Sequence, residues 1–175
     1  DMLNNPNMNY DFDGQKKVYP DIKLIYWCGG NPFHHHQDLN SLNEAWKKPD
    51  TIIVNEPWWT ATAKRADIVF PATTSYERED IGKAVGGDHF IIHMPKLIDP
   101  VGEAKNDYLI FSELSKRLGS FKTFTEGRND KEWIKYLYDD FQNFVTKAGV
   151  KCPGLEEVKK QNWIALPIEG KKFAS

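Results

Sequence analysis

Short apolar runs alternate with amphipathic stretches over residues 22–70. The runs at 22–27, 51–54 and 67–70 stop at Gly, Asn or Pro, which is typical of strands buried on both faces. Residues 38–47 place apolar side chains at helical spacing after a capping Asp, and 60–65 favour a short helix. Strands that alternate with helices in this way predict a parallel sheet covered by helices. We therefore expect the α/β class, as a three-layer α/β/α fold with a mainly parallel, Rossmann-like sheet.

The rest of the chain has a less regular pattern. Residues 89–94 favour one more strand, and 107–118 and 130–147 have the apolar periodicity of amphipathic helices. A short helix is expected at 155–161. Residues 1–20 are rich in Asn, Asp, Gly and Pro and show no period, which predicts an irregular segment before a single α/β domain at 21–175.

Composition narrows the class of protein. The chain has 175 residues, 40% of them apolar or aromatic, and 23 Lys and Arg against 25 Asp and Glu. This size suits one folded domain, and the near-neutral charge disfavours general nucleic-acid binding. Cys28 and Cys152 form neither a disulfide framework nor a zinc pattern, and no apolar run is long enough for a membrane span. Because the chain starts at Asp1 without a leader pattern, we expect it to be an excised piece of a longer polypeptide.

The unusual residues follow the predicted strands. Segments 29–37, 55–59 and 73–80 are polar or aromatic, and each comes just after a strand. Ligands of open parallel sheets bind at the carboxyl ends of the strands, so these segments are the candidate site.

The His-rich segment at 31–37 has three interpretations. Its adjacent histidines could bind a metal, or the segment could be a solvated or packed loop. It could also bind a polar ligand, because Gly29 and Gly30 let backbone N–H groups approach an anion while Asn31 and one His supply directional hydrogen bonds. Neither a GxGxxG motif nor a P-loop is present.

Other candidate binding and catalytic residues also have more than one interpretation. Residues 77–80 are either a solvated charged loop or a place where Arg78 meets a phosphate or a purine. Trp58 and Trp59 could pack or offer stacking platforms. Nucleophilic catalysis is disfavoured, because Ser75 lies outside a GxSxG elbow and Cys28 ends a predicted buried strand, where inert thiols are common.

Two long stretches carry a family resemblance. Residues 22–46, IKLIYWCGGNPFHHHQDLNSLNEAW, and 51–82, TIIVNEPWWTATAKRADIVFPATTSYEREDIG, resemble the dimethyl sulfoxide reductase family of molybdopterin enzymes. The similarity is greatest to the trimethylamine N-oxide, dimethyl sulfoxide and biotin sulfoxide reductases, and it continues more weakly through 107–119 to the end of the chain.

The resemblance implies a set of cofactor contacts in loops that follow the strands and at the start of a later helix. Relatives tend to have His-Asp or His-Glu where this chain has Asn55 and Glu56. The implied set is Gly30, Asn31, His35, Asn55, Glu56, Arg78 and Asp107.

The resemblance also implies a function for a longer parent. The parent would hold molybdenum in bis(molybdopterin guanine dinucleotide) and reduce an N-oxide or S-oxide with electrons from a cytochrome or another reductant. Its molybdenum ligand would be a serine in an earlier domain, so this chain would contain no catalytic or metal-ligating residue and would be inactive without the remaining domains. The parent would be periplasmic, or cytoplasmic if it is a biotin sulfoxide reductase.

One alternative of another class remains. The chain could be a stand-alone binding module of the same fold that uses the His-rich loop for a metal or a protein partner. If the chain is instead excised from an enzyme, we expect loops 29–37 and 73–88 to be its most mobile parts.

Overall fold

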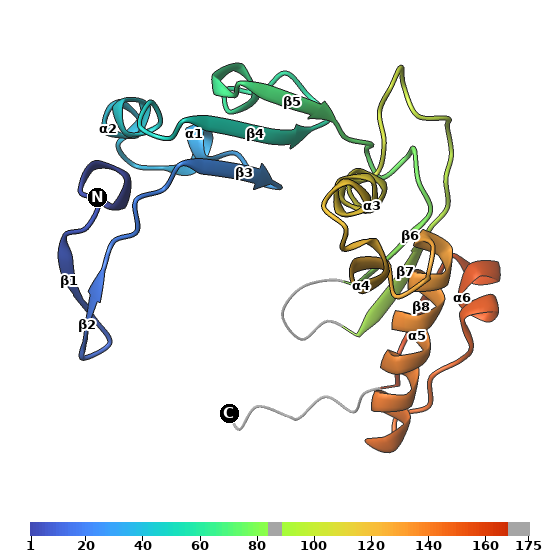
Figure 1. Cartoon of the computed structure of the whole chain (residues 1–175). Helices are drawn as coiled ribbons and strands as arrows, with labels where there is room; N and C mark the ends of the chain where they lie inside the picture. The colour runs from blue at the N-terminus through green and yellow to red at the C-terminus, as the bar shows by residue number, and fades with distance from the viewer. Residues whose placement is uncertain (84–88, 168–175) are drawn as a thin grey trace. The chain divides into compact units, whose positions relative to one another are not determined.

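The computed structural model describes residues 1–83 and 89–167. Contacts divide the chain into two compact units, Asp1–Ala72 and Thr73–Ser175, which are described separately below. Both combine helices and strands, which confirms the predicted α/β class (Figure 1). Within the described ranges no helix is both long and apolar enough to cross a membrane.

The first unit contains the predicted parallel sheet. Its strands β3 (Leu24–Cys28), β4 (Thr51–Glu56) and β5 (Ile68–Pro71) lie in the order β3-β4-β5, and both pairings are parallel (Figure 1). The register pairs Cys28 with Asn55 and Glu56 with Pro71, so all three strands end at one edge. The loops that follow β3 and β4 therefore start side by side.

Short helices connect these strands. After β3 come α1 (Pro32–His35) and α2 (Leu39–Ala45), and the 3₁₀ helix η2 (Ala63–Arg65) lies between β4 and β5. The predicted cap of the second helix is confirmed, since the Asp38 carboxylate accepts the Ser41 N–H at 2.9 Å. The helix expected at 60–65 is shorter than predicted and is a 3₁₀ helix.

Only the central strand of the three is well buried. Ile52 and Val54 of β4 form a core with Phe33 and Trp46. The prediction that all three strands are buried on both faces is wrong for β3 and β5, since Leu24 is 54% exposed and Ile68 is 43% exposed. These two strands lie at the edges of the sheet. Cys28 is also exposed, so the reason given for an inert thiol does not hold.

The first 20 residues are more regular than predicted. A 3₁₀ helix, η1 (Met2–Asn4), precedes a hairpin of β1 (Asn9–Phe12) and β2 (Gln15–Val18). Asp13 and Gly14 turn the hairpin with φ of 51° and 70°, the positive values that an Asp-Gly turn of type I′ requires. The expectation of an irregular segment is therefore wrong for residues 9–18.

The second unit is built on an antiparallel sheet. Its strands β6 (Asp80–Lys83), β7 (Phe90–Met94) and β8 (Trp163–Ala165) lie in the order β6-β7-β8. The helices are α3 (Asp107–Arg117), α4 (Phe121–Thr125), α5 (Asp130–Lys147) and α6 (Leu155–Gln161). The three helices predicted here are confirmed, and α4 is additional. The core joins β7, α5, α6 and β8 through Ile91, Tyr138, Leu155, Val158 and Ile164.

Candidate functional site

The turn after β3 depends on two glycines. Gly29 and Gly30 have φ of +79° and +69°, and nothing lies within 4 Å of a Cβ built on either residue. Backbone conformation, not space, therefore requires glycine here. The two residues carry the chain from the end of β3 into α1, which starts with Pro32.

Replacing Gly30 with alanine is expected to lower the free energy of unfolding by about 1 kcal/mol, because an L-residue is strained in the left-handed region. Gly154 is a matched control, because it has φ of −72° and equally open surroundings. Gly154→Ala should leave stability within about 0.5 kcal/mol of wild type. Urea unfolding of both variants measures the difference. Equal stabilities would contradict a conformational requirement at Gly30.

Asn31 lies directly after this turn, and it is held from another segment. Its side-chain oxygen accepts a hydrogen bond from the hydroxyl of Thr62, which is fully buried. His35 is exposed at the end of α1, and its ring lies 5.6 Å from that of His34. In the described ranges no group of three or more His, Cys, Asp or Glu could hold a metal ion.

Asn55 and Glu56 end β4 beside this turn. Asn55 is buried, and its side-chain oxygen accepts the Tyr26 hydroxyl at 3.1 Å. The Glu56 carboxylate accepts the Trp58 N–H and the Thr60 hydroxyl, each at 3.3 Å, and so fixes the loop after β4. Trp58 and Trp59 are 66% and 67% exposed, which excludes the packing interpretation within the described chain.

The charged segment at 77–80, in the second unit, is not a solvated loop. Glu77 is buried, and its carboxylate accepts N–H groups of Thr74 at 2.7 Å and of Val101 at 2.6 Å, together with the Thr74 hydroxyl. The Thr74 N–H bond, followed by the one from Val101, lowers the pKa of Glu77. The solvated interpretation is therefore wrong for Glu77, which joins two loops.

Arg78 is held in place by its neighbours. Its guanidinium donates to the Asp80 carboxylate from Nε at 3.1 Å and from Nη2 at 2.9 Å, and from Nη1 to the Thr73 carbonyl at 3.2 Å. Its side chain is 30% exposed. Because a guanidinium has five N–H groups, others remain to meet an anion.

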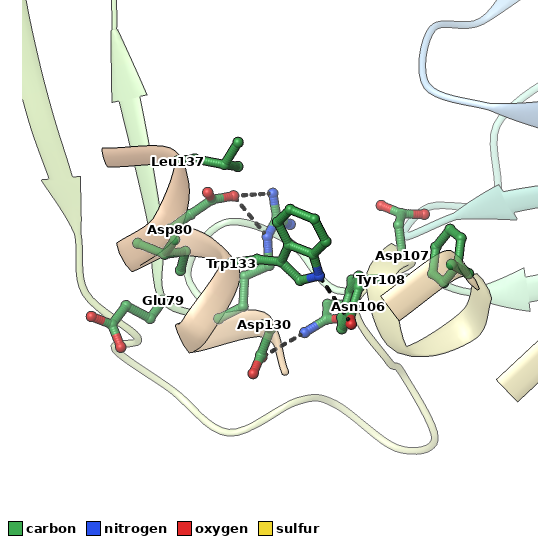
Figure 2. Close-up of a pocket in the computed structure, with 11 residues that line it drawn as sticks. Glu79, Asp80, Asn106, Asp107, Tyr108, Asp130, Trp133 and Leu137 are labelled. Atoms are coloured by element: carbon green, nitrogen blue, oxygen red, sulfur yellow. Dashed lines mark hydrogen bonds and ion pairs between the residues drawn. The ribbon is translucent and has the colours of Figure 1, made fainter. Parts of the chain in front are cut away.

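Arg78 and Asp107 line one cavity of about 450 Å³ in the second unit (Figure 2). Asp107 is exposed in the first turn of α3, as predicted, and Asn106 caps this helix by accepting the Leu109 N–H at 2.7 Å. A carboxylate and a guanidinium therefore share a cavity wide enough for a nucleobase.

Aromatic side chains form the wall between α3 and α5. Figure 2 shows Trp133 beside Tyr108; the indole N–H donates to the Tyr108 hydroxyl at 3.2 Å. Phe124 and Leu137 also line the cavity. Flat apolar walls beside a carboxylate suit a planar base that carries hydrogen-bond donors.

The predicted contacts thus form two groups. The structure brings Gly30, Asn31, Asn55 and Glu56 to the carboxyl edge of the parallel sheet, with His35 one helical turn beyond. Arg78 and Asp107 both line the cavity in the other unit. The predicted mobility of loops 29–37 and 73–88 stays a prediction, and residues 84–88 lie outside the described residues.

Comparison with known proteins decides the family. A model described as molybdopterin oxidoreductase matches residues 7–117. The chain belongs to the molybdopterin oxidoreductase family. It is 54% identical over 170 residues to a biotin sulfoxide reductase of Cereibacter sphaeroides, covering 97% of this chain and 23% of the relative. A dimethyl sulfoxide/trimethylamine N-oxide reductase of Rhodobacter capsulatus is 45% identical over 96% of the chain and 20% of its own length.

A trimethylamine-N-oxide reductase of Haemophilus influenzae is 50% identical over 93% of this chain and 20% of the relative. The chain thus spans about a fifth of the length of the curated relatives that it matches. Among solved structures, acetylene hydratase from Pelobacter acetylenicus aligns with a TM-score of 0.64 at 23% identity, over 84% of this chain and 19% of that one. This match supports the fold.

The sequence alone did not single out several residues around the predicted contacts. Thr62 and Tyr26 hold the two asparagines, and Asp80 holds Arg78. A buried threonine just before a short helix has no sequence signal, whereas Asp80 follows Arg78 closely enough that its opposite charge could have indicated the pair.

Proposed function

We propose that the chain binds the guanine dinucleotide end of a bis(molybdopterin guanine dinucleotide) molybdenum cofactor in a longer N-oxide or S-oxide reductase. The observation that carries this proposal is the cavity lined by both Arg78 and Asp107 in a chain closely similar to named N-oxide and S-oxide reductases. We propose the same substrate class for the longer protein: trimethylamine N-oxide, dimethyl sulfoxide or biotin sulfoxide.

The residues suit a guanine nucleotide. A carboxylate such as Asp107 can accept two hydrogen bonds from the N1–H and N2–H₂ edge of guanine, with Tyr108 and Trp133 on the same cavity for the ring faces. Arg78 supplies positive charge for a phosphate. At the sheet edge, the left-handed Gly30 and the carboxamide of Asn31 suit contacts with uncharged or anionic oxygens.

The bound cofactor would supply the two-electron chemistry by which molybdenum takes an oxygen atom from the oxide. The residues described above bind and orient; none of them is proposed to transfer the oxygen or a proton. The remaining domains of the longer protein and an electron donor are proposed partners for turnover.

The test is an NMR titration of the ¹⁵N-labelled chain with GDP, with ADP as the base control. We expect shift changes at residues 30–31, 55–56, 78 and 107 with GDP only. Asp107→Ala should weaken binding at least about tenfold, because it removes hydrogen bonds to a charged group. Glu103→Ala is the matched control, since this exposed carboxylate does not line the cavity.

A guanine-independent response, or none up to millimolar GDP, would contradict the proposed nucleotide site on this chain. If Glu103→Ala weakened GDP binding as much as Asp107→Ala does, the effect would be one of general charge, and this result would also contradict the guanine contact.

A further inference from the structure

The Thr62 hydroxyl has one hydrogen-bond partner among the described residues, and this partner is a predicted cofactor contact. Thr62 is 0% exposed, and its hydroxyl donates to Oδ1 of Asn31 across 31 positions of sequence. A hydroxyl proton that is buried away from water needs an acceptor. If the carboxamide were turned round, its NH₂ group would face the hydroxyl and this proton would lose its acceptor.

The carboxamide of Asn31 therefore has a defined orientation. With Oδ1 engaged by Thr62, the NH₂ group is the part of the carboxamide that can meet a ligand. We propose that Thr62 is a positioning residue that fixes Asn31 as a hydrogen-bond donor toward an anionic oxygen, so that this edge of the sheet binds the diphosphate part of a nucleotide.

The side-chain oxygen of a second asparagine at the same edge also has a partner within the protein. Asn55 pairs in register with the end of β3, and its Oδ1 accepts the Tyr26 hydroxyl at 3.1 Å. Both carboxamides thus use their oxygen within the protein. The Asn31 carboxamide, with its oxygen engaged by Thr62, suits a phosphate, which accepts hydrogen bonds, and not the donor edge of guanine.

The segment that carries Thr62 is itself fixed. Glu56, at the end of β4, accepts the Thr60 hydroxyl at 3.3 Å, and that hydroxyl accepts the Ala63 N–H at 3.2 Å. The Thr62 hydroxyl is therefore anchored from β4 by hydrogen bonds within its own segment. This anchoring makes Thr62 separable from the rest of the site by mutation.

The ligand assigned to Asn31 rests on the proposed function, whereas the contact between Thr62 and Asn31 does not. Two readouts therefore test the two parts separately. The first is the side-chain NH₂ resonances of Asn31 in the ligand-free, ¹⁵N-labelled chain. Thr62→Val keeps the shape and removes the hydroxyl, and should shift these resonances; Thr62→Ser restores the hydroxyl and should return them to the wild-type positions.

The second readout is the affinity for GDP. Thr62→Val should weaken it about fivefold to tenfold, in the range of one lost hydrogen bond, while Thr62→Ser stays within about twofold of wild type. Asn31→Asp replaces the donor with a carboxylate oxygen and should weaken GDP more than GMP, because a second phosphate group then meets the negative charge.

The outcomes separate the two claims. Unchanged Asn31 NH₂ resonances in a folded Thr62→Val variant would overturn the orienting contact, whether or not GDP binds. Wild-type GDP affinity of Asn31→Asp would overturn the donor role. No GDP binding by the wild-type chain would overturn the proposed function and with it the ligand assigned to Asn31, while the resonance shift would still establish Thr62 as the residue that orients it.

Discussion

Replacing Trp46 with alanine should lower the free energy of unfolding of the first unit by about 3–5 kcal/mol, the range for a large aromatic side chain removed from a core. Trp46 is 5% exposed, its indole N–H donates to the Arg65 carbonyl at 3.2 Å, and its ring lies 5.3 Å from that of Phe33. The substitution removes both contacts and leaves a cavity against β4. Urea unfolding with hydrogen exchange of β4 amides measures the loss.

Trp58→Ala is the matched control for this experiment. Trp58 is 66% exposed, so its removal should change the unfolding free energy by less than about 0.5 kcal/mol. If Trp46→Ala cost no more than Trp58→Ala, Trp46 would not be a core residue of this unit.

Glu79→Gln should destabilise the second unit by about 2 kcal/mol at neutral pH, because it removes a partly buried charged acceptor. Its carboxylate accepts from Lys159 of α6 at 2.8 Å and lies 3.3 Å from Nε2 of His93 of β7. The hydrogen bond from Lys159 is the main cause that lowers the pKa of Glu79, and the hydrogen bond with His93 lowers this pKa further. Burial opposes both effects, because it disfavours the charged carboxylate.

The sign of the pH dependence follows from this lowered pKa. The stabilisation is fully present above the pKa of an unfolded Glu, about 4.3, and is lost as the pH falls through the lower pKa of the folded state. The difference between wild type and Glu79→Gln should therefore shrink steadily between about pH 4 and pH 2.

Thermal unfolding across this range measures the difference. Glu156→Gln is the control, because Glu156 lies 3.8 Å from the same lysine but is 83% exposed. It should have little effect at any pH. A difference for Glu79→Gln that stays constant down to pH 2 would show that its charge does not contribute to stability.

Local sequence signals predicted most of the fold. The parallel sheet, the capped second helix and the helix at 130–147 each follow from a few neighbouring residues whose spacing shows which face is apolar. The hairpin at 9–18 was missed although its Asp13-Gly14 signal is local. The predicted burial of β3 and β5 on both faces was wrong, because what covers a strand depends on its place in the sheet and on distant segments, which an apolar run does not reveal.

The sequence predicted which positions along the chain belong to the candidate site, but not the contacts that hold their side chains. Parallel strands that end in register bring the loops after β3 and β4 together, which strand order alone implies. The contacts that hold these residues are long-range: Thr62 reaches Asn31 over 31 positions, and Val101 reaches Glu77 over 24. Such pairs depend on the finished fold, so no local pattern indicates them.

The ion pair that holds Arg78 also affects how a ligand would bind. Ordering a free arginine side chain on binding costs about 0.5–1.5 kcal/mol in conformational entropy. Because Asp80 and the Thr73 carbonyl already restrain Arg78, much of this loss occurs on folding. The same carboxylate offsets the positive charge, so long-range attraction of an anion is weaker. An anion that meets Arg78 would thus be captured more slowly, but with a smaller entropy loss, than at an unrestrained arginine.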